Sequence, residues 1–191
     1  MRTFIAIDFP ARITQKIDNI VSYLKTQTPA KAIKWVAAEN LHLTLKFLGD
    51  FPKQNLGQLT AILDHELNQI AAFDILIEGM GMYPNNTNPR VIWLGISSGG
   101  SLGKIHQLLD DALQKIGVKP DRRNFTAHLT IARVRRKTDP KSIQAIGTTL
   151  SEFKVETLGL VTIDRVILMK SELTPQGPIY TALHYATLNR V

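Results

Sequence analysis

The stretch "LHLTLKFL" at residues 41–48 alternates apolar and polar side chains. A period of two is typical of a β-strand, because successive side chains of a strand point to opposite faces. The pattern predicts one face with Leu41, Leu43, Leu45 and Phe47, and another with His42, Thr44, Lys46 and Leu48. A lone histidine on such a strand is more often a hydrogen-bonded structural residue than a catalyst, so a second copy would change the interpretation.

The chain contains that second copy. Residues 42–48 read "HLTLKFL" and residues 128–134 read "HLTIARV", with identical His, Leu and Thr and a Leu-to-Ile exchange at the fourth position. The two histidines are separated by 86 residues, nearly half of the 191-residue chain. This spacing indicates an internal duplication. An approximate two-fold axis between the halves would bring His42, Thr44, His128 and Thr130 to one cleft.

Two histidines facing one cleft suit displacement at phosphorus. A neutral imidazole can take a proton from an attacking group while an imidazolium gives one to a leaving group, since the reference pKa of histidine is about 6.5. The hydroxyls of Thr44 and Thr130 can donate hydrogen bonds to the phosphate oxygens on which charge accumulates. The arrangement predicts a bell-shaped pH profile, and it requires neither a metal nor a covalent intermediate.

A catalytic metal is the alternative that two histidines raise. Cysteine is absent, no H-E-x-x-H spacing occurs, and neither motif contains an acidic residue, so we expect no metal and no cofactor. The other histidines are weaker candidates as catalysts. His65 and His106 lie off or at the edge of predicted helical stripes, and His184 lies in a terminal strand as a core residue or a neighbour of the cleft.

The composition is that of a folded protein with a basic surplus. Lys and Arg number 23 against 16 acidic residues, which gives a formal charge of +7. Such a surplus attracts nucleic acid or phosphorylated small molecules, although it also serves solubility alone. Six basic residues cluster late in the chain: Arg122, Arg123, Arg133, Arg135, Arg136 and Lys137.

We expect one domain over residues 1–191, in the cytoplasm. The start "MRTFIAIDFP" lacks the apolar core of a signal peptide, and no run approaches the roughly 18 apolar residues of a membrane span. The absence of cysteine is compatible with a reducing compartment.

The periodicity predicts strands and helices in two halves of similar content. Strands are expected at 2–8, near Trp35, and in "FDILIEGMGMY", "RVIWLGI", "DRVILMKSEL" and "IYTALHYATL", besides the two motif strands. Helices are expected at 11–26, 56–70, 102–116 and 140–150. This order predicts an α+β protein in which two sheets face a shared cleft and the helices lie outside.

The two motifs resemble the twin H-x-[ST]-x signature of the 2H phosphoesterases, in particular the RNA 2′,3′-cyclic phosphodiesterases, formerly called 2′-5′ RNA ligases. The resemblance covers nearly the whole chain. It includes the segments "MRTFIAID", "KWVAAENLHLTLKFLGD", "NPRVIWLGI", "RRNFTAHLTIARV" and "SELTPQGPIYTAL". It implies a bilobed α+β fold, with two antiparallel-rich sheets related by a pseudo-two-fold axis and one motif contributed by each lobe.

The resemblance also implies a reaction and residue roles. The expected reaction is metal-free hydrolysis of a terminal 2′,3′-cyclic phosphate to a 2′-phosphomonoester. His42 would protonate the departing 3′ oxygen, His128 would activate water, and Thr44 and Thr130 would hold the phosphate. Arg133 matches the arginine that follows the second motif and would add positive charge there. The residues alone leave open which histidine is the acid and which is the base.

Partners and alternatives follow from the same resemblance. The expected substrates are RNA ends or 2′,3′-cyclic nucleotides, including tRNA fragments, acted on by a monomer without a membrane. A minor reverse reaction would join RNA ends by a 2′-5′ linkage. The alternative function is a non-catalytic RNA or nucleotide binder that uses the same basic groove.

Two departures from the family pattern concern single residues. Ala127 precedes His128 where many relatives carry proline, and Tyr83 stands where phenylalanine is frequent. We expect neither to touch the chemistry. Phe9, Tyr83 and Phe125 are the aromatic candidates for stacking on a base, and packing in the core is the simpler interpretation of each.

Overall fold

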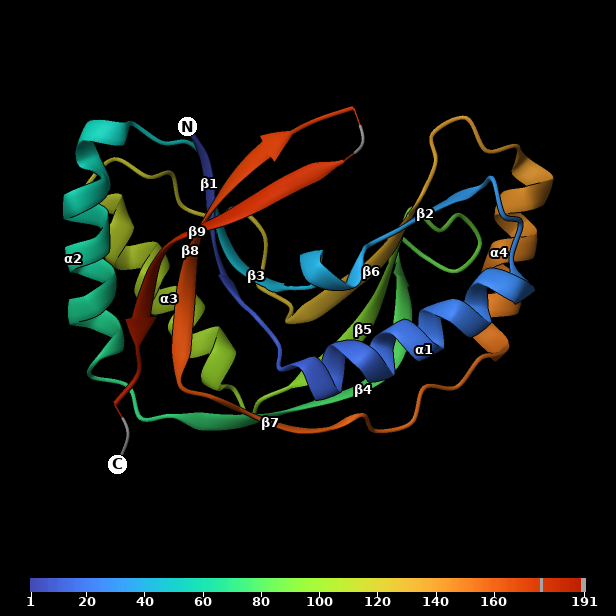
Figure 1. The fold of residues 1–191 in the computed structure, drawn as a ribbon, viewed down its shortest axis with the longest axis horizontal. Coiled ribbons are helices and arrows are strands. Elements are labelled where there is room, and N and C mark those ends of the chain that lie inside the picture. Colours follow the sequence, from blue (N-terminus) through green and yellow to red (C-terminus); the bar gives the residue numbers. More distant parts are fainter. Residues whose placement is uncertain (176, 190–191) are drawn as a thin grey trace.

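A computed structural model describes residues 1–175 and 177–189 and has the predicted α+β composition (Figure 1). The helices are α1 (Ala11–Gln27), α2 (Leu56–Leu67), α3 (Ser101–Gln114) and α4 (Pro140–Glu152). The strands are β1 (Arg2–Ile7), β2 (Ile33–Trp35), β3 (Leu43–Asp50), β4 (Phe73–Tyr83), β5 (Val91–Ser97), β6 (His128–Val134), β7 (Gly159–Ile163), β8 (Arg165–Leu173) and β9 (Pro178–Thr187).

The strands form two antiparallel sheets, one for each motif. The first sheet has the order β3-β1-β8-β9, and the second has the order β2-β6-β5-β4-β7. The motif strands β3 and β6 contact each other, so the two sheets meet at the motifs. With β2 set aside, the orders β3-β1-β8-β9 and β6-β5-β4-β7 correspond strand for strand. The internal duplication predicted from the sequence therefore extends to the whole topology.

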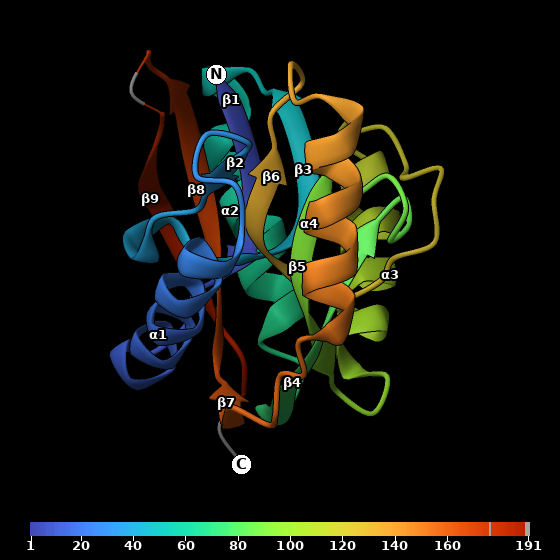
Figure 2. The same ribbon diagram turned by 90° about the vertical axis from the view of Figure 1, so that its right-hand side faces the viewer.

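Two helices, α1 and α3, pack on the sheet that does not contain the strand before them. Although α1 follows β1 of the first sheet, it packs on the second: Arg12 donates to the carbonyl of Leu160 in β7 at 3.0 Å, and Tyr23 stacks on Phe153. Conversely, α3 follows β5 of the second sheet and packs against β3 and α2. Figure 1 shows α2 with α3 toward one end of the molecule and α1 with α4 toward the other. Figure 2 looks onto the α4 end, with α2 behind the strands.

Local sequence explains where the helices begin and which faces they bury. In α1, Ile13, Ile17, Val21 and Leu24 recur at helical spacing, and all four are buried. Asp139 caps α4 by accepting a hydrogen bond from the Ser142 amide at 2.9 Å, and Pro140 occupies the first helical position. Within the described residues, none of the helices combines the length and the apolar character that a bilayer-spanning segment needs.

The predicted alternation of residues 41–48 is correct as far as Leu45 and wrong beyond it. Thr44 pairs with Ala6 and Lys46 pairs with the preceding Ile5, so Leu45 is an extra residue in β3. Such a β-bulge shifts the following side chains to the opposite faces. Lys46, expected beside His42, is therefore buried at 1% exposure, whereas Phe47, expected in the core, is 64% exposed.

The second motif strand has the same irregularity at the equivalent position. Thr130 pairs with Trp93 and Ala132 pairs with Ile92, which makes Ile131 the extra residue of β6. Burial follows the same order in both strands, so Ala132 is buried like Lys46 and Arg133 is exposed like Phe47. The pseudo-symmetry thus holds at the level of single residues in the two motifs.

Helix α4 packs against the 84–90 loop at Gly147, which allows a test of the packing. A Cβ atom added at Gly147 would collide with the carbonyl oxygen of Asn86, whereas one added at Gly57 in α2 would meet nothing within 4 Å. We expect Gly147→Ala to lower the free energy of unfolding by about 1–3 kcal/mol, as overpacking does. Gly57→Ala, the matched control, should leave it unchanged or raise it by up to about 1 kcal/mol. Denaturant titration of both variants measures this difference, and equal stabilities would contradict the packing described.

Candidate active site

Both motif histidines are oriented by the same backbone hydrogen bond. Nδ1 of His42 lies 2.7 Å from the carbonyl oxygen of Asn40, and Nδ1 of His128 lies 2.7 Å from the carbonyl oxygen of Thr126. A carbonyl can only accept, so Nδ1 carries the proton and Nε2 is the nitrogen available for proton transfer. Both rings therefore have the same tautomer, and in each case the carbonyl that fixes it belongs to the residue two positions before the histidine.

Each histidine packs against two aromatic rings of its own sheet. The His42 ring lies 4.9 Å from Phe4 and 5.1 Å, edge to face, from Tyr180. The His128 ring lies 5.3 Å from Tyr83 and 6.2 Å from Trp93, in both cases edge to face. These contacts fix the plane of each imidazole. Tyr83, a residue not expected from the sequence to touch the chemistry, therefore contacts one of the two motif histidines.

The environments of the two histidines differ in burial. Burial lowers the pKa of His42, because desolvation disfavours the imidazolium, and the hydrogen bond to Asn40 only partly opposes this effect. His42 is thus biased toward the neutral form in the free protein. The hydrogen bond that orients His128 is exposed to solvent, whereas the one that orients His42 is partly buried. Two copies of one motif therefore provide chemically different imidazoles.

The two threonines follow their histidines on the same face of each strand. Thr44 and Thr130 are half-buried, between fully buried neighbours on either side. Among residues 1–175 and 177–189, no hydrogen-bond partner is found for either hydroxyl. Both hydroxyls can therefore donate to a ligand placed between the strands.

Arg133 and Tyr180 link the two motifs. The bulge at Ile131 leaves Arg133 exposed on β6, and its positive charge acts on Tyr180, the tyrosine whose ring contacts His42. Burial raises the pKa of Tyr180, while the charges of Arg133 and Arg2 act in the opposite direction. A side chain of motif 2 therefore lies close enough to influence the surroundings of the motif 1 histidine.

The remaining histidines take structural roles. His184 pairs with Asp64 of α2 at 2.7 Å, and Nε2 of His65 lies 3.3 Å from the Gln69 amide. His106 is buried and lies 3.0 Å from Asp121. Of the proposed stacking residues, Phe9 is in the core and Phe125 stacks on His106, so both are packing residues.

A group of potential metal ligands lies beneath the motif 1 strand. The ligand atoms of His106, Asp110 and Asp121 lie within 4.8 Å of one another. The ammonium of Lys46 already bonds Asp110 and lies 3.3 Å from Asp121, so a cation of this chain occupies the position between the carboxylates. These donors therefore serve an internal ion pair rather than a metal.

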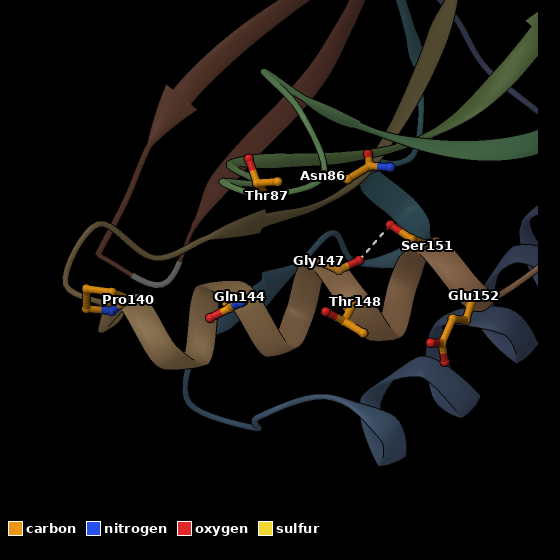
Figure 3. Close-up of a pocket in the computed structure, with 8 residues that line it drawn as sticks. All are labelled: Asn86, Thr87, Pro140, Gln144, Gly147, Thr148, Ser151 and Glu152. Atoms are coloured by element: carbon orange, nitrogen blue, oxygen red, sulfur yellow. Dashed lines mark hydrogen bonds between the residues drawn. The ribbon is translucent and has the colours of Figure 1, made fainter.

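Two cavities lie away from the histidines. One of about 520 Å³ is lined by the 84–90 loop and α4, and Figure 3 shows the side chains of Asn86 and Thr87 on the loop side and those of α4 on the other. The other, of about 290 Å³, lies where β1 and α1 meet β7 and β8. No residue of either H-x-T motif lines these cavities. The candidate active site is therefore the region where strands β3 and β6 contact each other, which carries His42 and Thr44 of motif 1 and His128 and Thr130 of motif 2 and is called the motif surface below.

Comparison with known proteins finds relatives over nearly the whole length of this chain. A protein from Archaeoglobus fulgidus is 35% identical over 183 residues, covering 96% of this chain and 98% of its own, and one from Methanothermobacter thermautotrophicus is 33% identical over 181 residues, covering 95% of each. Both relatives are named RNA 2′,3′-cyclic phosphodiesterase.

Solved structures share the fold. A Thermus thermophilus protein aligns over 100% of this chain and 99% of its own with a TM-score of 0.78 at 24% identity, and Escherichia coli LigT in complex with 3′-AMP aligns over 99% and 98% with a TM-score of 0.77. The family described as LigT like Phosphoesterase matches this chain twice, at residues 7–93 and 94–180, so that each match contains one motif. The predicted family is confirmed: this chain belongs to the LigT-like phosphoesterases.

Proposed function

We propose that this protein hydrolyses the 2′,3′-cyclic phosphate at an RNA end to a 2′-phosphomonoester, with His42 and His128 as the acid–base pair. One observation carries the proposal. Both imidazoles donate Nδ1–H to a carbonyl two residues upstream, at the same 2.7 Å distance, on strands that contact each other. Two Nε2 atoms prepared in this way suit the two proton transfers of a displacement at phosphorus.

In the proposed reaction, Nε2 of neutral His128 takes a proton from water as the water oxygen attacks phosphorus. The bond between phosphorus and the 3′ oxygen breaks, and the His42 imidazolium gives its proton to that oxygen. The product carries the phosphate on the 2′ oxygen, and the two histidines exchange protons with solvent before the next turnover. Every proton and bond is accounted for without a further reactant.

The hydroxyls of Thr44 and Thr130 donate to the non-bridging oxygens in this proposal, and Arg133 supplies positive charge. Neither hydroxyl has an internal partner in the described part of the chain, so neither must break a bond to bind phosphate. Donors held ready in this way stabilise the charge that develops in the transition state. Because burial lowers the pKa of His42, the negative charge of the bound phosphate is what keeps the acid protonated.

The substrate class rests on the relatives. Proteins 33% and 35% identical over nearly the full length are named RNA 2′,3′-cyclic phosphodiesterase. The formal charge of +7 suits a polyanionic substrate. The single domain, the monomeric and cytoplasmic state, the use of tRNA fragments and the minor 2′-5′ ligation stay predictions.

Phosphorus NMR of the product tests the proposal. With a 2′,3′-cyclic nucleotide and EDTA present, we expect turnover to a 2′-phosphomonoester, because no step uses a metal. His42→Ala and His128→Ala should each lower kcat at least about 10²-fold, the usual contribution of a general acid or base. His184→Ala, which removes a histidine paired with Asp64 outside the motifs, should keep the parental kcat. Formation of a 3′-phosphate, or substrate binding without turnover as in a pure RNA binder, would contradict the proposal.

The titration of His42 tests its assignment as the acid. Because burial lowers the pKa of His42, NMR titration of the free protein should show its imidazolium losing its proton below the ordinary histidine value of about 6.5. A bound phosphate favours the imidazolium, so the pKa of His42 should rise when inorganic phosphate is added. The same pKa of His42 with and without phosphate would count against His42 as the acid.

A further inference from the structure

A buried ion cluster lies on the reverse side of the motif 1 strand. The bulge at Leu45 turns Lys46 away from the motif surface and into the layer between β3 and α3. There its ammonium bonds Asp110, lies 3.3 Å from Asp121, and donates to the carbonyl of Lys119 at 3.2 Å. A buried lysine is stable only when its charge is compensated in this way.

The cluster holds the segment that leads to the second motif. The Asp121 amide donates to Asp110 at 3.0 Å, and the Asp121 carboxylate lies 3.0 Å from Nε2 of His106. The His106 ring in turn stacks on Phe125, with centroids 4.6 Å apart. Residues 119, 121 and 125 are thus all anchored to α3 or β3. The next residue, Thr126, supplies the carbonyl that orients His128.

The lysine of this cluster is not repeated at the pseudo-symmetric position of the second motif. The residue of β6 that corresponds to Lys46 is Ala132, which is buried but carries no charge. Motif 1 therefore contributes a charged side chain to the segment before motif 2, whereas the corresponding position of motif 2 carries an uncharged alanine. Lys46 lies four residues after His42, so this cluster joins the motif 1 segment to the segment that precedes His128.

We propose that Lys46 is a positioning residue for His128: through Asp110 and Asp121 it fixes the 119–126 segment, and so the carbonyl that sets the His128 tautomer. The reaction served is the one proposed above, and the inference rests on that function for its kinetic consequence. Without the ammonium, two carboxylates face each other beside His106, and repulsion between them releases the segment. The Thr126 carbonyl then no longer holds Nδ1 of His128 in place.

The test is Lys46→Met, which keeps most of the length of the side chain and removes its charge. Long-range nitrogen NMR of the imidazoles at alkaline pH reports the tautomer of each histidine. We expect the parent to show Nδ1–H at both His42 and His128, and the variant to lose this preference at His128 alone. The kcat for cyclic phosphate should fall at least about 10-fold, because small displacements of a catalytic group are costly.

Lys16→Met is the matched control. Lys16 is a lysine of α1 whose ammonium donates to the carbonyl of Leu158 at 2.7 Å, outside both motifs. This variant should change neither the tautomers nor kcat, even if it lowers the melting temperature. If Lys46 only stabilises the fold, Lys46→Met should likewise change neither the tautomers nor kcat. The comparison of the two variants therefore separates a positioning role from general stability.

Should Lys46→Met fail to fold, Asp121→Asn and Phe125→Leu provide the same test from the other side of the cluster. A folded variant that keeps the parental tautomer at His128 overturns the proposal, and so does an altered tautomer with parental kcat. If the parent lacks hydrolase activity, the proposed function fails, but the tautomer measurement still decides whether the cluster orients His128.

Discussion

The motif surface depends on a β-bulge at equivalent positions of two strands. Leu45 in β3 and Ile131 in β6 interrupt the pairing with β1 and β5 at equivalent positions. Up to the bulge, His and Thr alternate toward the motif surface with Leu toward the core. Beyond it, the alternation is inverted, so that Phe47 and Arg133 are exposed and Lys46 and Ala132 are buried. Bulges of this kind redirect side chains beside functional sites.

A symmetric frame can still hold two imidazoles in different surroundings. The backbone gives His42 and His128 the same tautomer by the same 2.7 Å contact, but their surroundings differ. His42 packs against Tyr180 and Phe4, where burial favours its neutral form, and the contact that orients His128 is open to solvent.

Much of this could be predicted from the sequence, because the relevant signals are local or repeated. The periods of two and of 3.6 located the helices α1 to α4 and most strands to within a few residues but gave no bounds for β7, and the duplicated H-L-T singled out the two imidazoles. The bulges could not be predicted, since a strand pattern says nothing about the register of its partner. The orientations of Lys46, Phe47 and Arg133 all depend on that register. Other contacts join segments that are distant in the sequence. Tyr180 contacts His42 because β9 belongs to the same sheet as β3. Nothing in the sequence distinguishes Asp110 and Asp121 from other polar residues, because their role depends on the burial of Lys46 beside them.

The exchange of helices has a consequence for any shorter protein of this architecture. Helix α1 leaves the sheet of β1 to cover the other sheet, and α3 makes the reciprocal crossing. Strands β4 and β8 cross in the same reciprocal manner. A polypeptide with only one H-x-T copy would therefore lack both a covering helix and a strand. It could form the motif surface only as an intertwined homodimer, in which each subunit contributes this helix and strand to the other subunit.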